Sequence, residues 1–340
     1  MSKCAFVKPL RCFAVSILAV LAVAASASAQ ETVLRITLQL PLTNHIGQNL
    51  LMFKEEVESA SNGEIEVQIF DSAQLYRDSE VPQAVSSGAI EMGTASLTRY
   101  VGDIPAVDIF YVPFMFDSEP LVRAATGPDS QVRQLVDDAI LANGARVLWW
   151  QPFGGSVFLS NDAPVARPDD LEGRRVRVFG RTLGNWIESM GGAPSLISGS
   201  EQFLAYQRGT VDIGMTGISG VQSRNLWDVM DTVTTTNYAV AEFIVVINEE
   251  FWESLPEDHR TIIETAARNA ESAVRDEIAQ IEAAAFDAAS TNGMTIYQPT
   301  DAEMVEWRAS AQPVIEDYLA TAGDLGQQVY DAAQALREAN

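Results

Sequence analysis

Strand and helix patterns alternate along the chain from residue 33 onward, and this order limits the folds that the chain can adopt. Three segments alternate apolar and other side chains as strands do, and two segments between them carry apolar groups at helical spacing. The strand patterns cover residues 33–40, 65–70 and 90–95, and the helix patterns cover residues 46–60 and 77–87. A helix between two strands provides the crossover connection that parallel neighbours need, so strands that alternate with helices usually pair in parallel. The order predicts a parallel sheet covered by helices.

The same alternation returns in the second half of the chain, beyond a proline-rich link that contains Pro164 and Pro168. Before the link, the patterns predict an extended segment over residues 104–116, a helix over 118–141 and a strand over 145–151. After it, they predict strands over 175–179 and 211–215 and helices over 182–190 and 200–208. The chain of 340 residues is long enough for two lobes with separate cores. We therefore predict an α/β fold with two lobes.

One long helix is predicted over residues 256–292, a segment rich in alanine and glutamate. Pro256 and the acids after it are typical of a helix start, and Asn292-Gly293 is typical of a helix end. A helix of this length is expected to cross both lobes.

The first 30 residues predict a cleaved secretory signal peptide. Lys3, Lys8 and Arg11 precede an apolar run over about residues 12–25, and Ala27-Ser28-Ala29 follows as a cleavage site. The run is shorter than the roughly 20 residues that a membrane-spanning helix needs. An uncleaved anchor is the alternative. The mature chain is therefore expected to be exported. Because both cysteines lie in the cleaved segment, it is expected to contain no disulfide or thiolate site.

Acidic residues strongly outnumber basic ones. The whole chain carries 22 Lys and Arg against 46 Asp and Glu, for a formal net charge of -24. Loss of the three basic residues of the signal peptide makes the mature chain more acidic still. Nucleic acid and anionic membrane surfaces would be repelled. No nucleic-acid partner is therefore expected, and no later segment is apolar enough to span a membrane.

The sequence offers little for catalysis or metal binding. His45 and His259 are the only histidines, and no H-E-x-x-H pair occurs. Residues 217–220 are one residue short of a G-x-S-x-G nucleophile turn, and no phosphate-binding G-x-x-x-x-G-K sequence is present. We predict no enzyme activity, no metal and no cofactor. Pairs of carboxylates could still come together in the fold, so an acid/base hydrolase stays open as an alternative.

Two arginines on a predicted strand offer a binding group for an anion. In the sequence Gly-Arg-Arg-Val-Arg-Val over residues 173–178, alternation sends Arg175 and Arg177 to one face of the strand. A guanidinium presents a fixed fork of donors that matches the two oxygens of a carboxylate. One arginine could point into a cleft for this purpose. A surface or interlobe salt bridge is the alternative, and the residues alone do not separate the two.

Five stretches in this order resemble the extracytoplasmic solute-binding proteins of tripartite ATP-independent periplasmic (TRAP) transporters, the family that includes C4-dicarboxylate and sialic acid receptors. They cover residues 63–75, 112–116, 169–178, 207–212 and 248–257. The resemblance extends over essentially the whole mature chain. It implies a two-lobed periplasmic-binding-protein fold, in which each lobe is a mixed sheet flanked by helices and a long helix links the lobes. Lobe I would comprise residues 31–151 and about 241–282, and lobe II residues 152–240 and about 283–340.

The resemblance also implies a set of ligand-binding residues. The family's carboxylate-binding arginine falls on Arg177. The other positions from which related proteins contact a ligand fall on Gln39, His45, Asp78, Ser96, Arg99, Gln151, Phe153, Ser156 and Thr216. Phe179, together with Phe153, Trp149 and Trp150, could form an apolar wall, with core packing as the alternative.

Two departures from the family pattern bear on the ligand. Val157 stands where some relatives, sialic acid receptors among them, carry a second arginine, and Gly199 stands where they carry an aromatic residue. Sialic acid is therefore disfavoured.

The function implied by the resemblance is that of a periplasmic receptor. It would bind a small organic acid between its lobes and deliver it to the small and large membrane subunits of a TRAP transporter, which use an ion gradient. A ligand-sensing partner of a signalling receptor and the receptor of an ATP-driven transporter remain alternatives, beside the hydrolase.

Overall fold

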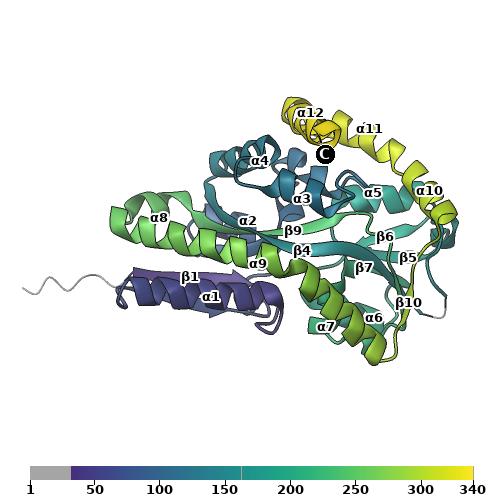
Figure 1. Ribbon diagram of the computed structural model, residues 1–340, viewed down its shortest axis with the longest axis horizontal. Coiled ribbons are helices and arrows are strands. Elements are labelled where there is room, and N and C mark those ends of the chain that lie inside the picture. Colours follow the sequence, from purple (N-terminus) through teal and green to yellow (C-terminus); the bar gives the residue numbers. More distant parts are fainter. Residues whose placement is uncertain (1–31, 162, 340) are drawn as a thin grey trace, which may run out of the picture. The chain divides into compact units, whose positions relative to one another are not determined.

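The computed structural model describes residues 32–161 and 163–339, and the predicted signal peptide over residues 1–30 lies outside them. Among the described residues, ten strands form one connected sheet whose main order is β2-β1-β3-β9-β4-β7-β5-β6. Figure 1 shows β4 and β9 in the middle of the molecule, with helices on both sides. The mixed α/β architecture agrees with the fold class that the sequence predicts.

The first strands pair in parallel, as the alternating pattern predicts. Strand β1 (Thr32–Leu38) lies between β2 (Ile65–Phe70) and β3 (Met92–Ser96), parallel to both. Helix α1 (His45–Ala60) connects the first pair, and Asn44 begins it by accepting a hydrogen bond from the backbone of Ile46. Helix α2 (Val81–Ser86) is shorter than predicted and begins close to Pro82.

Two antiparallel strands complete this part of the sheet. Strand β9 (Val240–Asn248) pairs with β3 on one side and with β4 (Ala145–Ser160) on the other. The sequence predicts that strand β4 ends at Gln151. In the structure it continues through Pro152 and Gly154, with a bulge between them. At the bulge, Gly154 has a φ of +98°, a positive value that glycine adopts more readily than other residues.

The far half of β4 belongs to a second group of strands. Strand β7 (Ile213–Gly217) pairs antiparallel with β4, and β5 (Arg175–Val178) is parallel to β7 and to β6 (Ala193–Leu196). The short strands β8 (Thr232–Thr234) and β10 (Thr295–Tyr297) pair with each other, and β8 also pairs with β4. Because β4 takes part in both groups, it joins the two halves of the sheet.

Several predicted segments differ from the structure. The segment over residues 104–116 is not extended, because Pro105 begins a 3-10 helix, η2 (Pro105–Tyr111). The helix over residues 118–141 is two helices, α3 (Glu119–Thr126) and α4 (Gln131–Ala142), because extended Gly127 and the following proline interrupt it. The remaining short elements are η1 (Leu97–Tyr100), η3 (Pro168–Leu171), α5 (Arg181–Ser189), η4 (Gly199–Glu201), α6 (Gln202–Gln207), α7 (Ile218–Ser223), η5 (Leu226–Asp228) and α8 (Glu249–Ser254).

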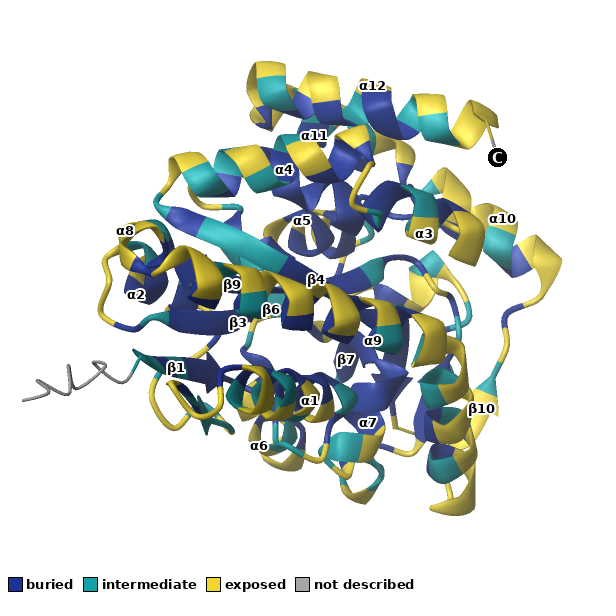
Figure 2. Cartoon of the chain, turned by 60° about the vertical axis from the view of Figure 1, so that its left-hand side comes forward, coloured by how far each residue is buried: buried dark blue, intermediate teal, exposed yellow. Residues whose placement is uncertain are grey.

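The long helix forms almost as predicted. Helix α9 (Glu257–Thr291) contacts α1 and β4 and, further along, α7 and β10. Figure 1 shows it running diagonally across the sheet, and in Figure 2 its buried and exposed faces alternate along its length. It therefore packs on elements of both predicted lobes. No helix among the described residues is both long and apolar enough to cross a membrane.

The C-terminal helices pack on elements from both halves of the chain. Helix α11 (Gln312–Thr321) contacts α5, whereas α12 (Gly323–Ala339) contacts α3, α4 and η2. Helix α10 (Asp301–Ala309) precedes them and begins with a capping box at Thr300. The assignment of residues 283–340 to lobe II stays a prediction, and α12 lies against the elements assigned to lobe I.

Buried apolar side chains form two cores. The larger one surrounds β1, β3, β9 and the first half of β4, and it includes Trp149 and Trp150 at 0% exposure. The smaller one lies under α6 and α7 and includes Val157. The indole nitrogens of Trp149 and Trp150 donate to Asn49 and Asp137. These two tryptophans therefore pack in the core and do not form an apolar wall of a ligand site.

Candidate functional site

A small cavity lies where the ends of strands from both halves of the sheet meet. Eight of the eleven residues named from the sequence line it: Gln39, Asp78, Ser96, Arg99, Phe153, Arg177, Phe179 and Thr216. Five further lining residues were not predicted: Gly199, Gly217, Arg224, Ala241 and Phe243. The cavity has about 30 Å³ of free space, room for roughly two water molecules.

Strand ends bring these residues together. Gln39 directly follows β1 and Ser96 ends β3, so both lie at the carboxyl edge of the parallel strands, and Arg99 follows in η1. Arg177 comes from β5 and Thr216 from β7, in the second group of strands. Ligands of open α/β sheets bind at this edge, outside the carboxyl ends of the strands.

Asp78 is the carboxylate at the centre of a buried network. Its side chain has 0% exposure and pairs with Arg99, whose Nε lies 2.6 Å from Oδ2. The amide of Gln39 donates to the same oxygen at 3.0 Å, and the hydroxyl of Ser198 donates to Oδ1 at 2.7 Å. Both carboxylate oxygens of Asp78 therefore accept hydrogen bonds from other side chains of the protein, and Arg99 balances its charge.

Arg175 and Arg177 have different environments, although both lie on β5. Arg175 is exposed and forms a two-pronged pair with Asp212, at 2.6 and 3.1 Å. Arg177 is only 3% exposed and lines the cavity. Of the two alternatives left open by the sequence, the surface ion pair applies to Arg175 and the position in a cavity applies to Arg177.

Arg177 has hydrogen bonds but no acidic partner. Its Nε donates to the carbonyl of Ile197 at 3.0 Å, and Nη1 donates to the carbonyl of Met215. Its guanidinium carbon lies 5.5 Å from the ring centre of Phe179. Burial lowers the pKa of Arg177, and the charge of Arg99 lowers it further. Within the described residues, no carboxylate lies at ion-pair distance from this guanidinium.

Arg224 is the functional candidate that the sequence did not reveal. It directly follows the short helix α7 and donates from Nη1 to Oε1 of Gln202 at 3.3 Å. Burial of its guanidinium, together with the nearby charge of Arg177, lowers the pKa of Arg224 to about 10. No motif surrounds Arg224, and only the packing of α7 against the strands brings it to the cavity.

Three arginines and one aspartate carry the charges of the cavity. Arg99 and Asp78 balance each other, whereas Arg177 and Arg224 have no carboxylate partner within the part of the chain that the structure describes. A buried charge without a partner is costly in a medium of low dielectric constant. The cavity therefore has an excess of positive charge that suits an anion, in a protein whose overall charge is strongly negative.

The three other residues named from the sequence lie outside this cavity. His45 begins α1, where its Nε2 is 2.9 Å from the carbonyl oxygen of Pro152, and burial lowers its pKa to about 4. Gln151 is fully buried and donates to Asn49 Oδ1 at 2.7 Å. Ser156 is fully buried on β4. The structure does not bring these three to the arginines.

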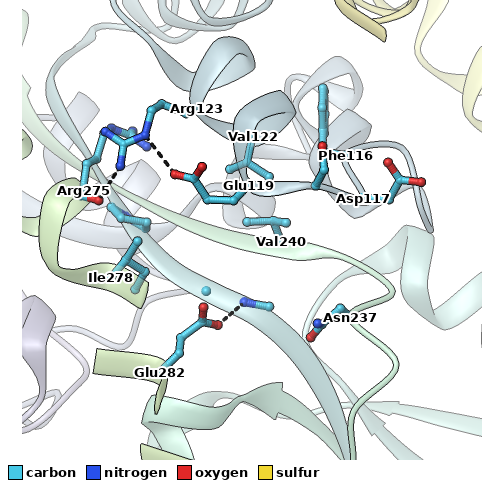
Figure 3. Close-up of a pocket in the computed structure, with 14 residues that line it drawn as sticks. Phe116, Asp117, Glu119, Val122, Arg123, Asn237, Val240, Arg275, Ile278 and Glu282 are labelled. Atoms are coloured by element: carbon cyan, nitrogen blue, oxygen red, sulfur yellow. Dashed lines mark hydrogen bonds and ion pairs between the residues drawn. The ribbon is translucent and has the colours of Figure 1, made fainter. Parts of the chain in front are cut away.

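Two other hollows flank α9. One is lined by α3, the bulge of β4 and α9, and there the carboxylate of Glu282 accepts a hydrogen bond from the backbone of Gly155 at 2.7 Å (Figure 3). The other is a groove between α1, α7 and α9, with His45 in its wall. Neither contains Arg177 or Arg224. Among the described residues, no cluster of three or more His, Cys, Asp or Glu could hold a metal ion.

Comparison with known proteins places the chain in a family. The model of the family "bacterial extracellular solute-binding protein, family 7" (DctP) matches residues 38–321. Among curated proteins, the chain is similar to the C4-dicarboxylate-binding periplasmic protein DctP of Rhodobacter capsulatus. The two are 26% identical over 306 residues, which cover 87% of this chain and 89% of that protein.

Solved structures share the fold. DctP7, an extracytoplasmic solute receptor of Bordetella pertussis that binds pyroglutamic acid, superposes with a TM-score of 0.84 at 22% identity, over 89% of this chain and 99% of that one. A TRAP periplasmic solute-binding protein from Sulfurospirillum deleyianum with bound succinate gives 0.83 at 22% identity, over 91% and 99%. These neighbours confirm the predicted two-lobed fold.

The resemblance drawn from the five sequence stretches is thereby confirmed. The family consists of binding proteins and not of enzymes, so it gives no support to the hydrolase alternative. Its model spans most of the described chain and far more than half of the 340 residues. The protein belongs to family 7 of the bacterial extracellular solute-binding proteins.

Proposed function

We propose that the protein is a periplasmic receptor for a small organic acid, which it holds between its two lobes through a carboxylate pair with Arg177. The observation that carries this proposal is the guanidinium of Arg177, which is buried in the central cavity without an acidic partner among the described residues. A carboxylate would neutralise the charge and accept two parallel hydrogen bonds from the planar fork.

Relatives support an acid as the ligand. DctP7 is a receptor that binds pyroglutamic acid, and the Sulfurospirillum deleyianum protein contains succinate. Another structural neighbour, from Chromohalobacter salexigens, contains D-glucuronate. These ligands differ in size and in polar groups, but each of them has a carboxylate. A carboxylate is the feature that an arginine would recognise in all of them.

Entry of such an acid requires the lobes to separate. The free space of about 30 Å³ is smaller than any organic acid with several heavy atoms. Two hydrogen bonds cross between the predicted lobes. One joins Ser198 to Asp78 at the cavity, at 2.7 Å, and the other joins Asn44 to Ser223 in the groove between α1, α7 and α9, at 3.0 Å. In an open form these bonds would break, and a bound acid would favour the closed form through contacts from both lobes.

Export and delivery complete the proposal. The predicted signal peptide would take the chain to the periplasm, and the membrane complex of a TRAP transporter would accept the acid from the closed receptor. A ligand-sensing partner of a signalling receptor would bind the same acids. Uptake by vesicles that contain the two membrane subunits would separate the two roles, since only a transport receptor would be required for accumulation.

A thermal-shift screen tests the binding site. The signal-free protein is heated with dicarboxylates, keto acids, aromatic acids and sugar acids, because a ligand of the native state raises the melting temperature. The screen is repeated on Arg177→Gln and, as a matched control, on Arg175→Gln, which removes an equal charge from the same strand.

We expect at least one acid to stabilise the original protein and Arg175→Gln, but not Arg177→Gln. Loss of the carboxylate pair should weaken binding by about 2–5 kcal/mol. An acid that stabilises all three proteins equally would contradict the role of Arg177. Absence of any shift over the whole set would contradict an organic-acid receptor.

A further inference from the structure

We propose that the hollow of Figure 3 is a second ligand site, which binds a small organic ammonium ion with an apolar tail through the carboxylate of Glu282. Among the described residues, the hollow shares no lining residue with the cavity that contains Arg177 and Arg224. The inference therefore goes beyond the receptor function and does not depend on it.

The hollow lies behind a strand that lines the cavity. Ala241 and Phe243 of β9 line the cavity, whereas Val240 lines the hollow. Successive side chains of a strand point to opposite faces, so alternation along β9 places the hollow on the other face. The hollow has about 190 Å³ of free space, about six times that of the cavity, and exposed Glu119 and Asn237 lie in its wall. A molecule of several heavy atoms can therefore enter it without separation of the lobes.

Glu282 is the one acid of the hollow that has no cationic partner among the described residues. The other two, Asp117 and Glu119, form ion pairs with arginines at 2.7 and 2.9 Å. Glu282 instead accepts a hydrogen bond from the backbone of Gly155 at 2.7 Å. Burial raises the pKa of Glu282, although this hydrogen bond opposes the rise. A cation at the carboxylate would offset the cost of burying its charge.

The two arginines that line the hollow have other partners. Arg275 donates to Glu271 at 3.0 Å, and Arg123 donates to Glu119 at 2.9 Å. Figure 3 shows Arg123 turned towards Glu119 and away from Glu282. Within the part of the chain that the structure describes, neither arginine lies at ion-pair distance from Glu282. The position beside this carboxylate is therefore open to the positive group of a ligand.

Apolar side chains line the rest of the space. Figure 3 shows the carboxylate of Glu282 pointing into the hollow, whose apolar wall includes Val240, Ile278, Val122 and Phe116. An apolar chain in this space would remove apolar surface from water on both partners. A neutral molecule would leave the carboxylate unpaired, and an anion would be repelled by it. The combination fits an alkylammonium ion, which has one charged end and an apolar tail.

Pentylammonium and 1-pentanol test the site, because they have the same chain length and differ in charge. Each is titrated by calorimetry into the signal-free protein without any organic acid, at neutral pH and ordinary salt, which screens attraction to the acidic surface. The titrations are repeated on Glu282→Gln, whose amide oxygen can still accept the hydrogen bond from Gly155. Asp287→Asn is the charge-matched control, since Asp287 is exposed on the same helix. Thermal unfolding without ligand shows whether each variant is folded.

We expect the original protein and Asp287→Asn to bind pentylammonium at one saturable site. This binding should be about tenfold or more tighter than that of 1-pentanol, as one charged hydrogen bond implies. Glu282→Gln should bring the affinity for the ion close to that for the alcohol. Methylammonium should bind the original protein more weakly than pentylammonium, because it leaves the apolar wall uncovered.

Three results would overturn the inference. They are equal affinity for the ion and the alcohol, a preference for the ion that survives in Glu282→Gln, and binding that does not saturate, which would indicate general attraction of cations to the surface. If Glu282→Gln does not fold, the comparison of charge and of chain length on the original protein still decides. None of these results concerns the binding of acids at Arg177, so this inference and the proposed function can fail separately.

Discussion

Arg175 and Arg177 differ in environment because of what covers each end of β5. Both were predicted on one face of a strand, and alternation alone gave no reason to choose between them. Asp212, just before β7, meets Arg175 at the exposed end, whereas Arg177 lies deeper among buried neighbours. The choice depends on how β7 and β5 pair, which is a long-range property that a local pattern does not contain.

The family resemblance predicted the candidate site only in part. Arg177, which lies in one of the five stretches, lines the cavity, whereas His45 and Gln151, which the resemblance also implied, do not. Arg224 follows a helix of six residues with no motif around it, and its guanidinium lies close to Gly199 and Gly220. Such an approach becomes visible only when the backbone is known.

Substitution of Asp78 tests the charge balance of the cavity. Asp78→Asn leaves the buried guanidinium of Arg99 without a counter-charge, so the free energy of unfolding should fall by about 3–5 kcal/mol. Urea denaturation measures the loss. Asp212→Asn is the matched control, because it breaks the exposed pair with Arg175 and should cost much less. Equal losses in the two variants would contradict the importance of the buried pair.

At the scale of elements, prediction succeeded where one periodic pattern had clear ends. Helix α9 and the parallel strands β1, β2 and β3 lie within two residues of their predicted positions. The predicted strand over residues 145–151 is shorter than β4. Proline and glycine usually end a strand, but here a bulge accommodates Pro152 and Gly154. The placement of β9 between β3 and β4 joins segments about 90 to 150 residues apart, and no local signal specifies such a pairing.

Strand β9 also places a buried acid against α9. Glu242 has 0% exposure, and Oε2 lies 3.7 Å from Nη2 of Arg275, too far for a hydrogen bond. Neither carboxylate oxygen of Glu242 has a hydrogen-bond partner among the described residues. Arg275 instead donates to Glu271 at 3.0 Å. Burial raises the pKa of Glu242 to about 7, although the charge of Arg275 opposes this rise.

This pKa predicts how stability changes with pH. The folded protein holds the proton of Glu242 more tightly than the unfolded chain does, so this stabilisation is complete below about pH 4.5 and is lost as the pH rises through 7. Glu242→Gln cannot titrate, and Arg275 keeps Glu271 as a partner. Between pH 5 and 8 the original protein should therefore lose on the order of 1–3 kcal/mol relative to the variant.

Urea denaturation at several pH values between 5 and 8 measures the difference. Glu91→Gln serves as a control for loss of a carboxylate. Burial acts to raise the pKa of Glu91, but hydrogen bonds from Arg35 hold it below its ordinary value, so it does not titrate in this range. Curves for the original protein and Glu242→Gln that run parallel across the range would contradict the raised pKa.

At the scale of the whole molecule, a local positive site lies in a strongly acidic protein. The net charge of -24 repels anions at long range, and salt screens this repulsion beyond about 10 Å at ordinary ionic strength. In the proposed function, attraction of the acid therefore depends on cavity arginines close to it: Arg177, which is buried, and Arg224, which is partly buried. The proposed function predicts discrimination against neutral molecules, since a neutral ligand would leave the charge of Arg177 unbalanced.

The position of a bound acid tests the account most directly. A crystal structure of the signal-free protein with an acid that raises its melting temperature would show which hollow the acid occupies. We predict both oxygens of one carboxylate about 3 Å from the guanidinium of Arg177, in the cavity that Asp78 and Arg99 also line. An acid bound instead beside Glu282, in the hollow of Figure 3, or in the groove between α1, α7 and α9, would contradict the account.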